Sequence, residues 1–373
     1  MVNIGKRVLA RGLSTALVGL FSLSTVLAAQ QAQHYKQTNL VSDIPGMAAA
    51  TDPNLVNPWG MSRSSGSPWW ISDNGPGLTT LYSGTGTTLS LVVSIPPADS
   101  SSGQGGTPTG QIFNGTTGFQ VAPGFPARFI FVTEDGTVSG WNSGVNAASA
   151  VIMVNTKSAS AFKGVAVATV NDPVMGAVNF LYVADFRKGH VNVYDTSFQR
   201  IRLGDDAFAD ERIPRGYAPF NIQNIGGNLF VAYAMQDNAK HDEVDGAGLG
   251  YVDVFSPTGR LLLSLQSGPW FNAPWGIALA SGDFGAYSHD ILVGQFGSGE
   301  ILVFDPVTGH YKGNLVDSTN APIAIEGLWG LAFGSGGGSG PANSLYFTAG
   351  PGGEQHGLFG TITAVENQLG GDH

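Results

Sequence analysis

Short runs of β-branched and aromatic residues recur along the chain, each bounded by glycine, proline or polar turn residues. Residues 190–195 (HVNVYD) alternate apolar and polar side chains, as expected of a strand with one face in a core. Residues 251–255 and 300–305 repeat this alternation. The 54 glycines and 20 prolines are spread along the chain and supply many tight turns between short strands. The pattern predicts an all-β protein.

The runs form units of similar length, each with the same order of strands. Every unit has a first strand with a glycine motif, a β-rich second run, a turn, an alternating third strand and a fourth strand. The aligned glycine, or asparagine in one unit, recurs every 50 to 57 residues at Gly60, Gly110, Gly164, Asn221, Gly276 and Gly330. Radial repetition of four antiparallel strands is the arrangement of a propeller. We therefore expect residues 30–373 to form one six-bladed β-propeller.

The last unit lacks a fourth strand, because the chain ends soon after residues 360–365. An unassigned strand-like stretch, residues 35–41, precedes the first unit. Pairing these two segments would close the ring and remove two exposed sheet edges. The sequence thus predicts a propeller closed by its N-terminal strand.

A Pro-Trp-Gly motif opens the unit at residues 58–60 and again at residues 274–276. Innermost strands crowd near the axis of a propeller, so the glycine would let neighbouring backbones approach. The tryptophan would fill the wedge between adjacent blades and bury a large apolar surface. The motif is therefore interpreted as structural.

Residues 1–29 have the pattern of a secretory signal peptide. Lys6, Arg7 and Arg11 precede an apolar stretch over residues 12–27, and small residues follow at the expected cleavage site. The alternative is an uncleaved membrane anchor, but this stretch is shorter than the roughly 20 residues that span a bilayer. We expect a secreted or periplasmic protein that has no membrane segment after cleavage.

The overall charge disfavours anionic partners. The formal net charge is −10, and it becomes −13 without residues 1–28, which contain three basic residues and no acid. Without a basic patch, nucleic acid is a poor partner, whereas cations and neutral small molecules, glycans included, fit better. The absence of cysteine excludes disulfides, thiolate metal sites and a thiol nucleophile.

Three segments resemble known propeller blades. Residues 275–278 (WGIA), 181–185 (LYVAD) and 191–195 (VNVYD) are similar to the NHL-type blade. The resemblance extends to the group that contains streptogramin lyase and the gluconolactonase-like hydrolases. Over nearly its whole mature length the chain also resembles an exported bacterial propeller family, through residues 57–60 (NPWG), 72–75 (SDNG), 108–110 (PTG) and 237–242 (DNAKHD). Because propellers host unrelated activities, the resemblance implies a fold more than a reaction.

Polar residues stand at or near the start of strand one in four units: Asn57, Asn221, Asn272 and Glu326. We expect them to converge at the central channel mouth, where oxygen ligands suit Ca²⁺ or another divalent cation. Glu326-Gly327 followed by Trp329 resembles the gluconolactonase-like group, whose corresponding glutamate binds the metal; the rest of that group's catalytic set has no match here. The alternative is that these side chains bind channel waters and turn backbones.

Four residues that follow strand two are expected to surround the same mouth as ligand-binding groups: Asp73, Asp185, Asp237 and Gln295. Two histidines in turns on that face are the candidates for a catalytic base. His241 lies in a long acidic turn, and His356 lies in the corresponding turn of the last unit. The alternative for His241 is a solvated charged loop.

Two classes of function remain open. The first is an exported module that binds a small ligand or a divalent cation at the channel mouth. The second is a metal-assisted lyase or hydrolase of the streptogramin-lyase or gluconolactonase-like kind, with a histidine as base. The sequence leaves open whether the protein is an enzyme.

Overall fold

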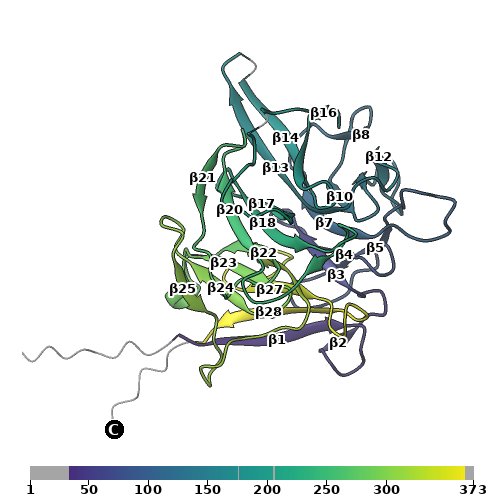
Figure 1. The fold of residues 1–373 in the computed structure, drawn as a ribbon. Coiled ribbons are helices and arrows are strands. Elements are labelled where there is room, and N and C mark those ends of the chain that lie inside the picture. Colours follow the sequence, from purple (N-terminus) through teal and green to yellow (C-terminus); the bar gives the residue numbers. More distant parts are fainter. Residues whose placement is uncertain (1–32, 175, 205, 366–373) are drawn as a thin grey trace, which may run out of the picture. The chain divides into compact units, whose positions relative to one another are not determined.

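The computed structural model describes residues 33–174, 176–204 and 206–365; the predicted signal peptide lies outside these residues. Six sheets are arranged in a ring (Figure 1). In blades 1 to 5 the four main strands pair in sequence order, whereas the sixth blade is completed by the first strand of the described chain. Blades 1 and 2 consist of β3 (Pro58–Ser62), β4 (Trp69–Asp73), β5 (Leu78–Tyr82) and β6 (Val93–Ser94), then β7 (Pro108–Phe113), β10 (Phe129–Thr133), β11 (Thr137–Trp141) and β12 (Val151–Asn155). The six-bladed all-β prediction is confirmed.

The other blades keep the same plan. Blades 3 and 4 consist of β13 (Phe162–Asp172), β14 (Gly176–Asp185), β15 (His190–Tyr194) and β16 (Arg200–Ile201), then β17 (Tyr217–Ile225), β18 (Asn228–Gln236), β20 (Tyr251–Phe255) and β21 (Leu261–Ser264), with β19 (Glu243–Val244) added to β18. Blade 5 consists of β22 (Pro274–Leu279), β23 (Ile291–Gln295), β24 (Ile301–Phe304) and β25 (Tyr311–Asn314). Outside the blades are the hairpin of β8 (Gln120–Ala122) and β9 (Phe125–Pro126) and the short 3₁₀ helix Gly285–Tyr287.

Blade 6 contains both ends of the described chain. Its inner strands are β26 (Leu328–Phe333), β27 (Leu345–Ala349) and β28 (Leu358–Ala364), and β1 (Tyr35–Ser42) pairs antiparallel with β28 (Figure 1). The register joins Tyr35 to Ala364 and Asn39 to Gly360, which confirms the predicted closure. The short β2 (Ala50–Thr51) adds to β1 in parallel.

The hydrophobic core is divided among the seams between neighbouring blades. Phe230 of blade 4, for example, packs in one cluster with Ile277 and Ile291 of blade 5. Tyr35 on β1 belongs to the cluster between blades 5 and 6. Each blade is therefore stabilised mainly by its two neighbours, and the ring needs its closing strand to complete this packing.

Glycines on the inner strands permit close approach around the axis, as the sequence predicts. A Cβ on Gly110 would lie 2.8 Å from the Cα of Gly164 in the next blade, and one on Gly330 would lie 2.8 Å from the carbonyl oxygen of Trp59. In blade 4, Asn221 takes the place of glycine and its Nδ2 donates to the carbonyl of Trp275 in blade 5 at 2.7 Å.

The tryptophans directly before the aligned glycines of blades 1, 5 and 6 meet one another, so they fill the centre of the ring as well as the space between these neighbouring blades. Trp59 stacks on Trp329 with ring centroids 3.5 Å apart and meets Trp275 edge-on at 5.9 Å. We call the resulting cluster the axial plug; it comprises Trp59, Phe186, Phe220, Trp275, Phe296 and Trp329. The plug divides the channel into two ends.

In the described part of the chain, no helix has the length and apolar character needed to cross a membrane.

Candidate functional site

A fully buried lysine stands beside the axial plug. The repeat places an aromatic residue directly before the aligned glycine or asparagine in four blades, but blade 3 has Lys163 at this position. Its ammonium lies 4.8 Å from the ring centroid of Trp59, a distance suited to a cation–π interaction. Because burying an unpaired ammonium is costly, the charge requires anionic partners.

Acidic side chains from two neighbouring blades supply those partners. Lys163 Nζ lies 2.5 Å from Glu134 Oε1 and 3.4 Å from Asp242 Oδ1. Glu134 follows β10, where Thr133 Oγ1 accepts a 2.8 Å hydrogen bond from the backbone N–H of Thr137 and fixes the turn. The turn thereby holds the Glu134 carboxylate over Lys163.

Blades 1 and 6 add two more polar contacts. Asn74 Nδ2 donates to Glu134 Oε2 at 2.7 Å, and Asn57 Nδ2 donates to Glu354 Oε2 at 2.7 Å. Asn57 Oδ1 also accepts a 3.1 Å hydrogen bond from the indole of Trp329 in the plug. Asn57 and Glu354 both have left-handed backbones, with φ of 47° and 66°. Backbone strain of this kind in non-glycine residues gathers at functional sites.

The long loop between β18 and β19 brings a histidine to the same place. Asp237 Oδ1 accepts a 2.8 Å hydrogen bond from the backbone N–H of His241 and orders the loop. His241 Nδ1 lies 2.7 Å from Asp242 Oδ1. Glu243 follows as the first residue of β19 and is half-buried. We call the whole group the mouth cluster; it comprises Asn57, Asn74, Glu134, Lys163, His241, Asp242, Glu243 and Glu354.

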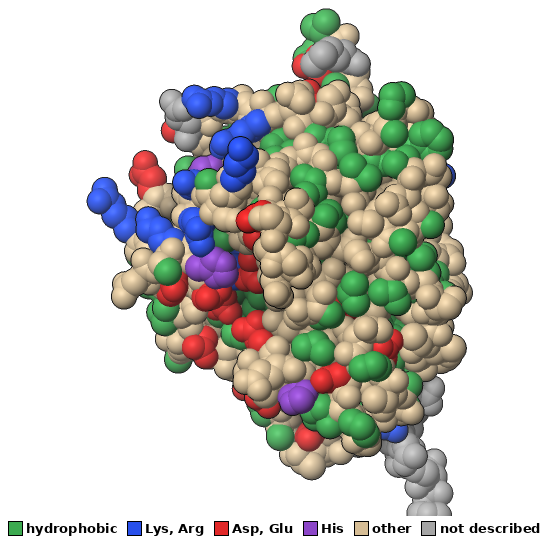
Figure 2. All heavy atoms as spheres, turned by 90° about the vertical axis from the view of Figure 1, so that its right-hand side faces the viewer, with side chains coloured by type: hydrophobic (Ala, Val, Ile, Leu, Met, Phe, Trp, Pro, Cys, Tyr) green, Lys and Arg blue, Asp and Glu red, His purple; other side chains and the backbone are tan. Residues whose placement is uncertain are grey.

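The mouth cluster carries more negative than positive charge. Four carboxyl groups accompany one ammonium, and His241 is the one other basic group among its members. Figure 2 shows acidic, basic and histidine side chains gathered toward the left of the molecule, while most of the facing surface is neutral. Within the mouth cluster itself the excess of carboxyl groups, in a partly dry site, attracts cations.

Burial and neighbouring charges shift the ionisation of several members. Burial by itself would lower the pKa of Lys163, but the carboxylates of Glu134, Glu243 and Asp242 together raise that pKa above its ordinary value. Burial raises the pKa of Glu243 to about 7, with the nearby Glu354 and Glu134 adding to the rise and Lys163 opposing it. Burial likewise raises the pKa of Glu354.

The histidine and its partner shift in opposite directions. The hydrogen bond with Asp242 raises the pKa of His241, against the effect of burial. The same bond, with help from Lys163, lowers the pKa of Asp242 to about 2. The mouth cluster thus contains a stable ammonium, an ionised aspartate, a carboxyl group, Glu243, whose pKa is about 7, and an imidazole, His241, whose pKa is raised.

Three members of the mouth cluster lie close enough together to share one metal ion. Glu134, His241 and Asp242 each offer one ligand atom, and these atoms lie within 4.8 Å of one another. Two carboxylates and an imidazole form a mixed donor set, accepted by first-row divalent ions as well as by Zn²⁺.

The residues expected to bind a metal have separate hydrogen-bond partners in the structure. Asn57 belongs to the mouth cluster. Asn221 lies deeper, where it joins blades 4 and 5, and Asn272 Oδ1 accepts from the backbone of Gly246 at 2.6 Å. Glu326 is exposed and its Oε1 accepts from the backbone N–H of Gly352 at 3.0 Å. The described hydrogen bonds link none of these four residues to another.

The expected ring of ligand-binding residues is mostly engaged within single blades. Asp73 is fully buried, and burial raises its pKa well above the ordinary value. Asp185 accepts from Asn192 Nδ2 at 3.0 Å. Gln295 is also buried, and its Oε1 accepts from the backbone N–H of Asn272 at 2.8 Å. Of these four residues, Asp237 contributes to the mouth cluster indirectly, because it orders the loop that contains His241.

The two histidines proposed as bases have different surroundings. His241 is part of the mouth cluster. His356 Nδ1 lies 2.8 Å from Asp43 Oδ2, and Asp43 Oδ1 accepts from the backbone of Gly357, so this pair fixes the loop between β27 and β28.

Lys163, Glu134, Glu243 and Glu354 were not singled out from the sequence. Lys163 has a signal in the repeat, since it replaces an aromatic residue at the axis. Glu134 corresponds to Asn74 in the turn after strand two, so the unit alignment could also have found it. Glu243 and Glu354 lie between the second and third strands of their blades, in segments whose lengths differ from unit to unit. The repeat therefore assigns them no equivalent positions.

The fold and the mouth cluster together define a six-bladed β-propeller with a charged site at one end of a plugged channel. No family model matches the chain. It is 32% identical over 308 residues to the uncharacterized protein L690 of Acanthamoeba polyphaga mimivirus, covering 80% of this chain and 78% of that protein. The uncharacterized protein R648 of the same virus is also 32% identical, over 80% of this chain and 73% of its own length. The chain belongs to the family of these two viral proteins.

Solved structures share the architecture at low identity. A streptogramin B lyase structure aligns with a TM-score of 0.50 and 13% identity, covering 89% of this chain and 98% of the lyase. The soluble aldose sugar dehydrogenase of Escherichia coli aligns with a TM-score of 0.49 and 13% identity, over 88% and 99% of the two chains. At such identity, the likeness to the lyase is one of fold.

Proposed function

We propose that this protein binds a divalent cation, alone or as part of a small ligand, at the mouth cluster. The observation that carries the proposal is the convergence of Glu134, His241 and Asp242 to within 4.8 Å beside a surplus of carboxylates. The sequence-based expectation of a cation at the channel mouth is retained, but its ligands are reassigned from Glu326 and the asparagines to these three residues.

The surplus charge explains why a cation would be favoured despite the neighbouring ammonium. Lys163 balances one of four carboxyl groups, and the raised pKa values of Glu243 and Glu354 reflect burial together with repulsion among the remaining acids. A bound cation would lower both pKa values and would require a neutral imidazole at His241. Binding should therefore release protons near neutral pH.

The test is titration calorimetry of the chelator-treated protein with Ca²⁺, Mn²⁺ and Zn²⁺ at pH 7. We expect at least one ion to bind, and Glu134→Gln and Asp242→Asn to weaken binding by about tenfold or more, because affinity depends on ligand charge. Glu326→Gln is the matched control, since it removes an exposed carboxylate outside the cluster. Absence of binding, or equal affinity in all four proteins, would contradict the proposal.

A second candidate is a metal-assisted lyase or hydrolase at the same site. Its supporting observation is that Glu243, whose pKa burial raises to about 7, lies beside the Lys163 ammonium and the proposed metal ligands, where it could transfer a proton while His241 holds the metal. The test is hydrolysis and elimination assays on lactone and cyclic depsipeptide substrates with the metal-loaded protein. Turnover that Glu243→Gln and His241→Asn abolish, while metal affinity persists in Glu243→Gln, would support it.

A further inference from the structure

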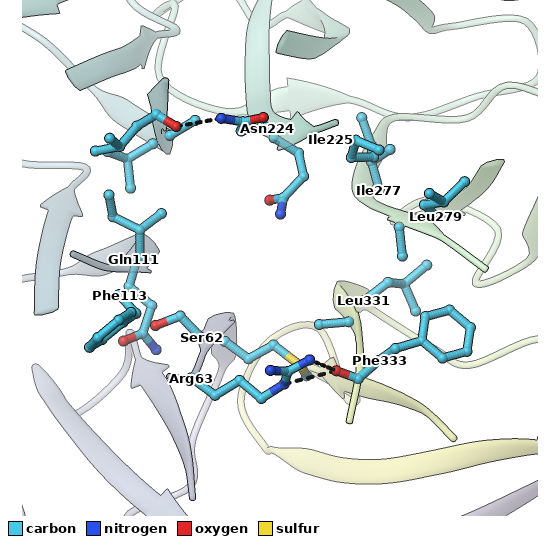
Figure 3. A pocket seen from close by; sticks show the side chains of 18 of the residues that line it. Ser62, Arg63, Gln111, Phe113, Asn224, Ile225, Ile277, Leu279, Leu331 and Phe333 are labelled. Atoms are coloured by element: carbon cyan, nitrogen blue, oxygen red, sulfur yellow. Dashed lines mark hydrogen bonds between the residues drawn. The ribbon is translucent and has the colours of Figure 1, made fainter. Parts of the chain in front are cut away.

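The end of the channel opposite the mouth cluster contains a cavity of about 470 Å³. Each blade contributes consecutive residues of its inner strand, which follow the aligned glycine or asparagine and so lie beyond the plug. Figure 3 shows these side chains encircling an open centre. We call it the far cavity; its lining includes Arg63, Phe113, Asn224, Ile277, Leu279 and Phe333.

The far cavity is separated from the mouth cluster. The axial plug lies between the two ends, and the space below it narrows to a cavity of about 20 Å³ beside Asn221 and Trp275. That space holds about one water molecule. A molecule in the far cavity would therefore make no contact with the mouth cluster.

The lining of the far cavity mixes aliphatic and aromatic side chains with polar groups, and its charge is opposite to that of the mouth cluster. Side chains such as Ile277 and Leu279 alternate around it with amides such as Asn224. Arg63 is the single charged residue in the described lining, which contains no carboxylate. A cavity of this volume is large enough for a small molecule.

The guanidinium of Arg63 is held in place without an acidic partner among the described residues. Its Nε and Nη2 donate to the carbonyl of Phe333 at 2.9 and 2.7 Å, and Nη2 also donates to that of Gly334 at 3.0 Å (Figure 3). The guanidinium carbon lies 5.4 Å from the ring centroid of Trp69. Nη1 makes no hydrogen bond to any described group, so the cation retains donors for a ligand.

We propose that the far cavity binds a small organic monocarboxylate, with its apolar body among the inner-strand side chains and its carboxylate at Arg63. Charge complementarity selects the anion, because the half-buried guanidinium is oriented by carbonyl groups that leave its charge unneutralised. Fixed donors need little reorganisation to bind a carboxylate.

A purely structural role for Arg63 gives a different expectation. Its bonds to Phe333 and Gly334 join blade 1 to blade 6, so the side chain also strengthens the seam where the ring closes. In that case substitution of Arg63 would lower the unfolding temperature. It would not change the relative affinities for a carboxylate and for an uncharged ligand of the same shape.

The experiment compares octanoate with octan-1-ol by titration calorimetry on the full chain. We expect octanoate to bind about tenfold to hundredfold more tightly than the alcohol, the range of one charge-assisted hydrogen bond. Arg63→Gln should abolish this preference, whereas Arg128→Gln, at an exposed arginine outside the cavity, should retain it. Glu134→Gln should leave octanoate binding unchanged, which separates this site from the proposed cation site.

A second variant covers the case in which Arg63→Gln fails to fold. Leu279 lies in the lining with 43% of its surface exposed, so Leu279→Glu should fold and place a repelling carboxylate in the cavity. Loss of octanoate binding in this variant supports the proposal. Equal affinity of the wild type for octanoate and octan-1-ol, absence of octanoate binding, or unaltered binding by Leu279→Glu would overturn it.

Discussion

Replacing Glu243 by glutamine should change how the stability of this protein depends on pH. Glu243 is half-buried in the mouth cluster, and burial raises its pKa from an ordinary 4.5 to about 7. The folded protein therefore holds this proton more tightly than the unfolded chain does. As pH rises from 4.5 through 7, ionisation of Glu243 lowers the free energy of unfolding, and glutamine removes this loss.

The magnitude follows from the two pKa values. Each tenfold change in a proton dissociation constant corresponds to about 1.4 kcal/mol. The raised pKa of Glu243 therefore changes the free energy of unfolding by at most about 3 kcal/mol. The stability of Glu243→Gln relative to wild type should thus increase by up to about 3 kcal/mol between pH 4 and pH 8. Any constant cost of fitting glutamine cancels in this difference.

The assay is urea denaturation of both proteins at several pH values in chelator-containing buffer. Asp242→Asn provides a control of opposite sign, because its hydrogen bond with His241 lowers the pKa of Asp242 to about 2. That variant should lose stability relative to wild type as pH rises from 2 to 4. A relative stability of Glu243→Gln that stays constant from pH 4 to pH 8 would refute the assigned burial and charge environment of Glu243.

Three further predictions concern closure, the buried lysine and export. Tyr35→Ala should lower the free energy of unfolding by about 3–5 kcal/mol in urea denaturation, because Tyr35 is buried on the closing strand, while Lys36→Ala at the exposed neighbouring position should have little effect. Lys163→Met should lower the free energy of unfolding by about 3–5 kcal/mol at pH 7, because it leaves the carboxylates unpaired. Acidification should recover part of this stability, and an equal loss at all pH values would contradict the prediction. N-terminal sequencing of protein from its native host should begin near Ala29 or Gln30, and an intact Met1 would exclude cleavage.

The fold was predictable because its determinants are local and repeated. Glycines such as Gly110 and Gly330 recur where neighbouring backbones meet, and each unit repeats one order of strands and turns. Closure of the ring was predictable by counting strands. The last unit had no fourth strand of its own, and the strand-like residues 35–41 belonged to no unit. Sheet edges strongly favour such pairing, so the sequence left few alternatives.

The site was predictable only in part, because it depends on how deep each side chain lies along the channel axis. Asn221 occupies the aligned glycine position, Asn57 precedes it by three residues, and Asn272 and Glu326 precede it by four. At about 3.3 Å per residue, these offsets place Asn221 roughly 10 Å further along the chain than the other three. Asn221 therefore lies deeper in the channel, although all four residues look equivalent by their place near strand one.

The most direct test of the proposed cation site is an anomalous difference map from crystals soaked in Mn²⁺ after chelator treatment. We predict a peak within coordinating distance of Glu134, His241 and Asp242, and loss of that peak in Glu134→Gln crystals. A map without a peak at the mouth cluster, or with its peak at Glu326, would contradict the assignment of these three residues as the ligands.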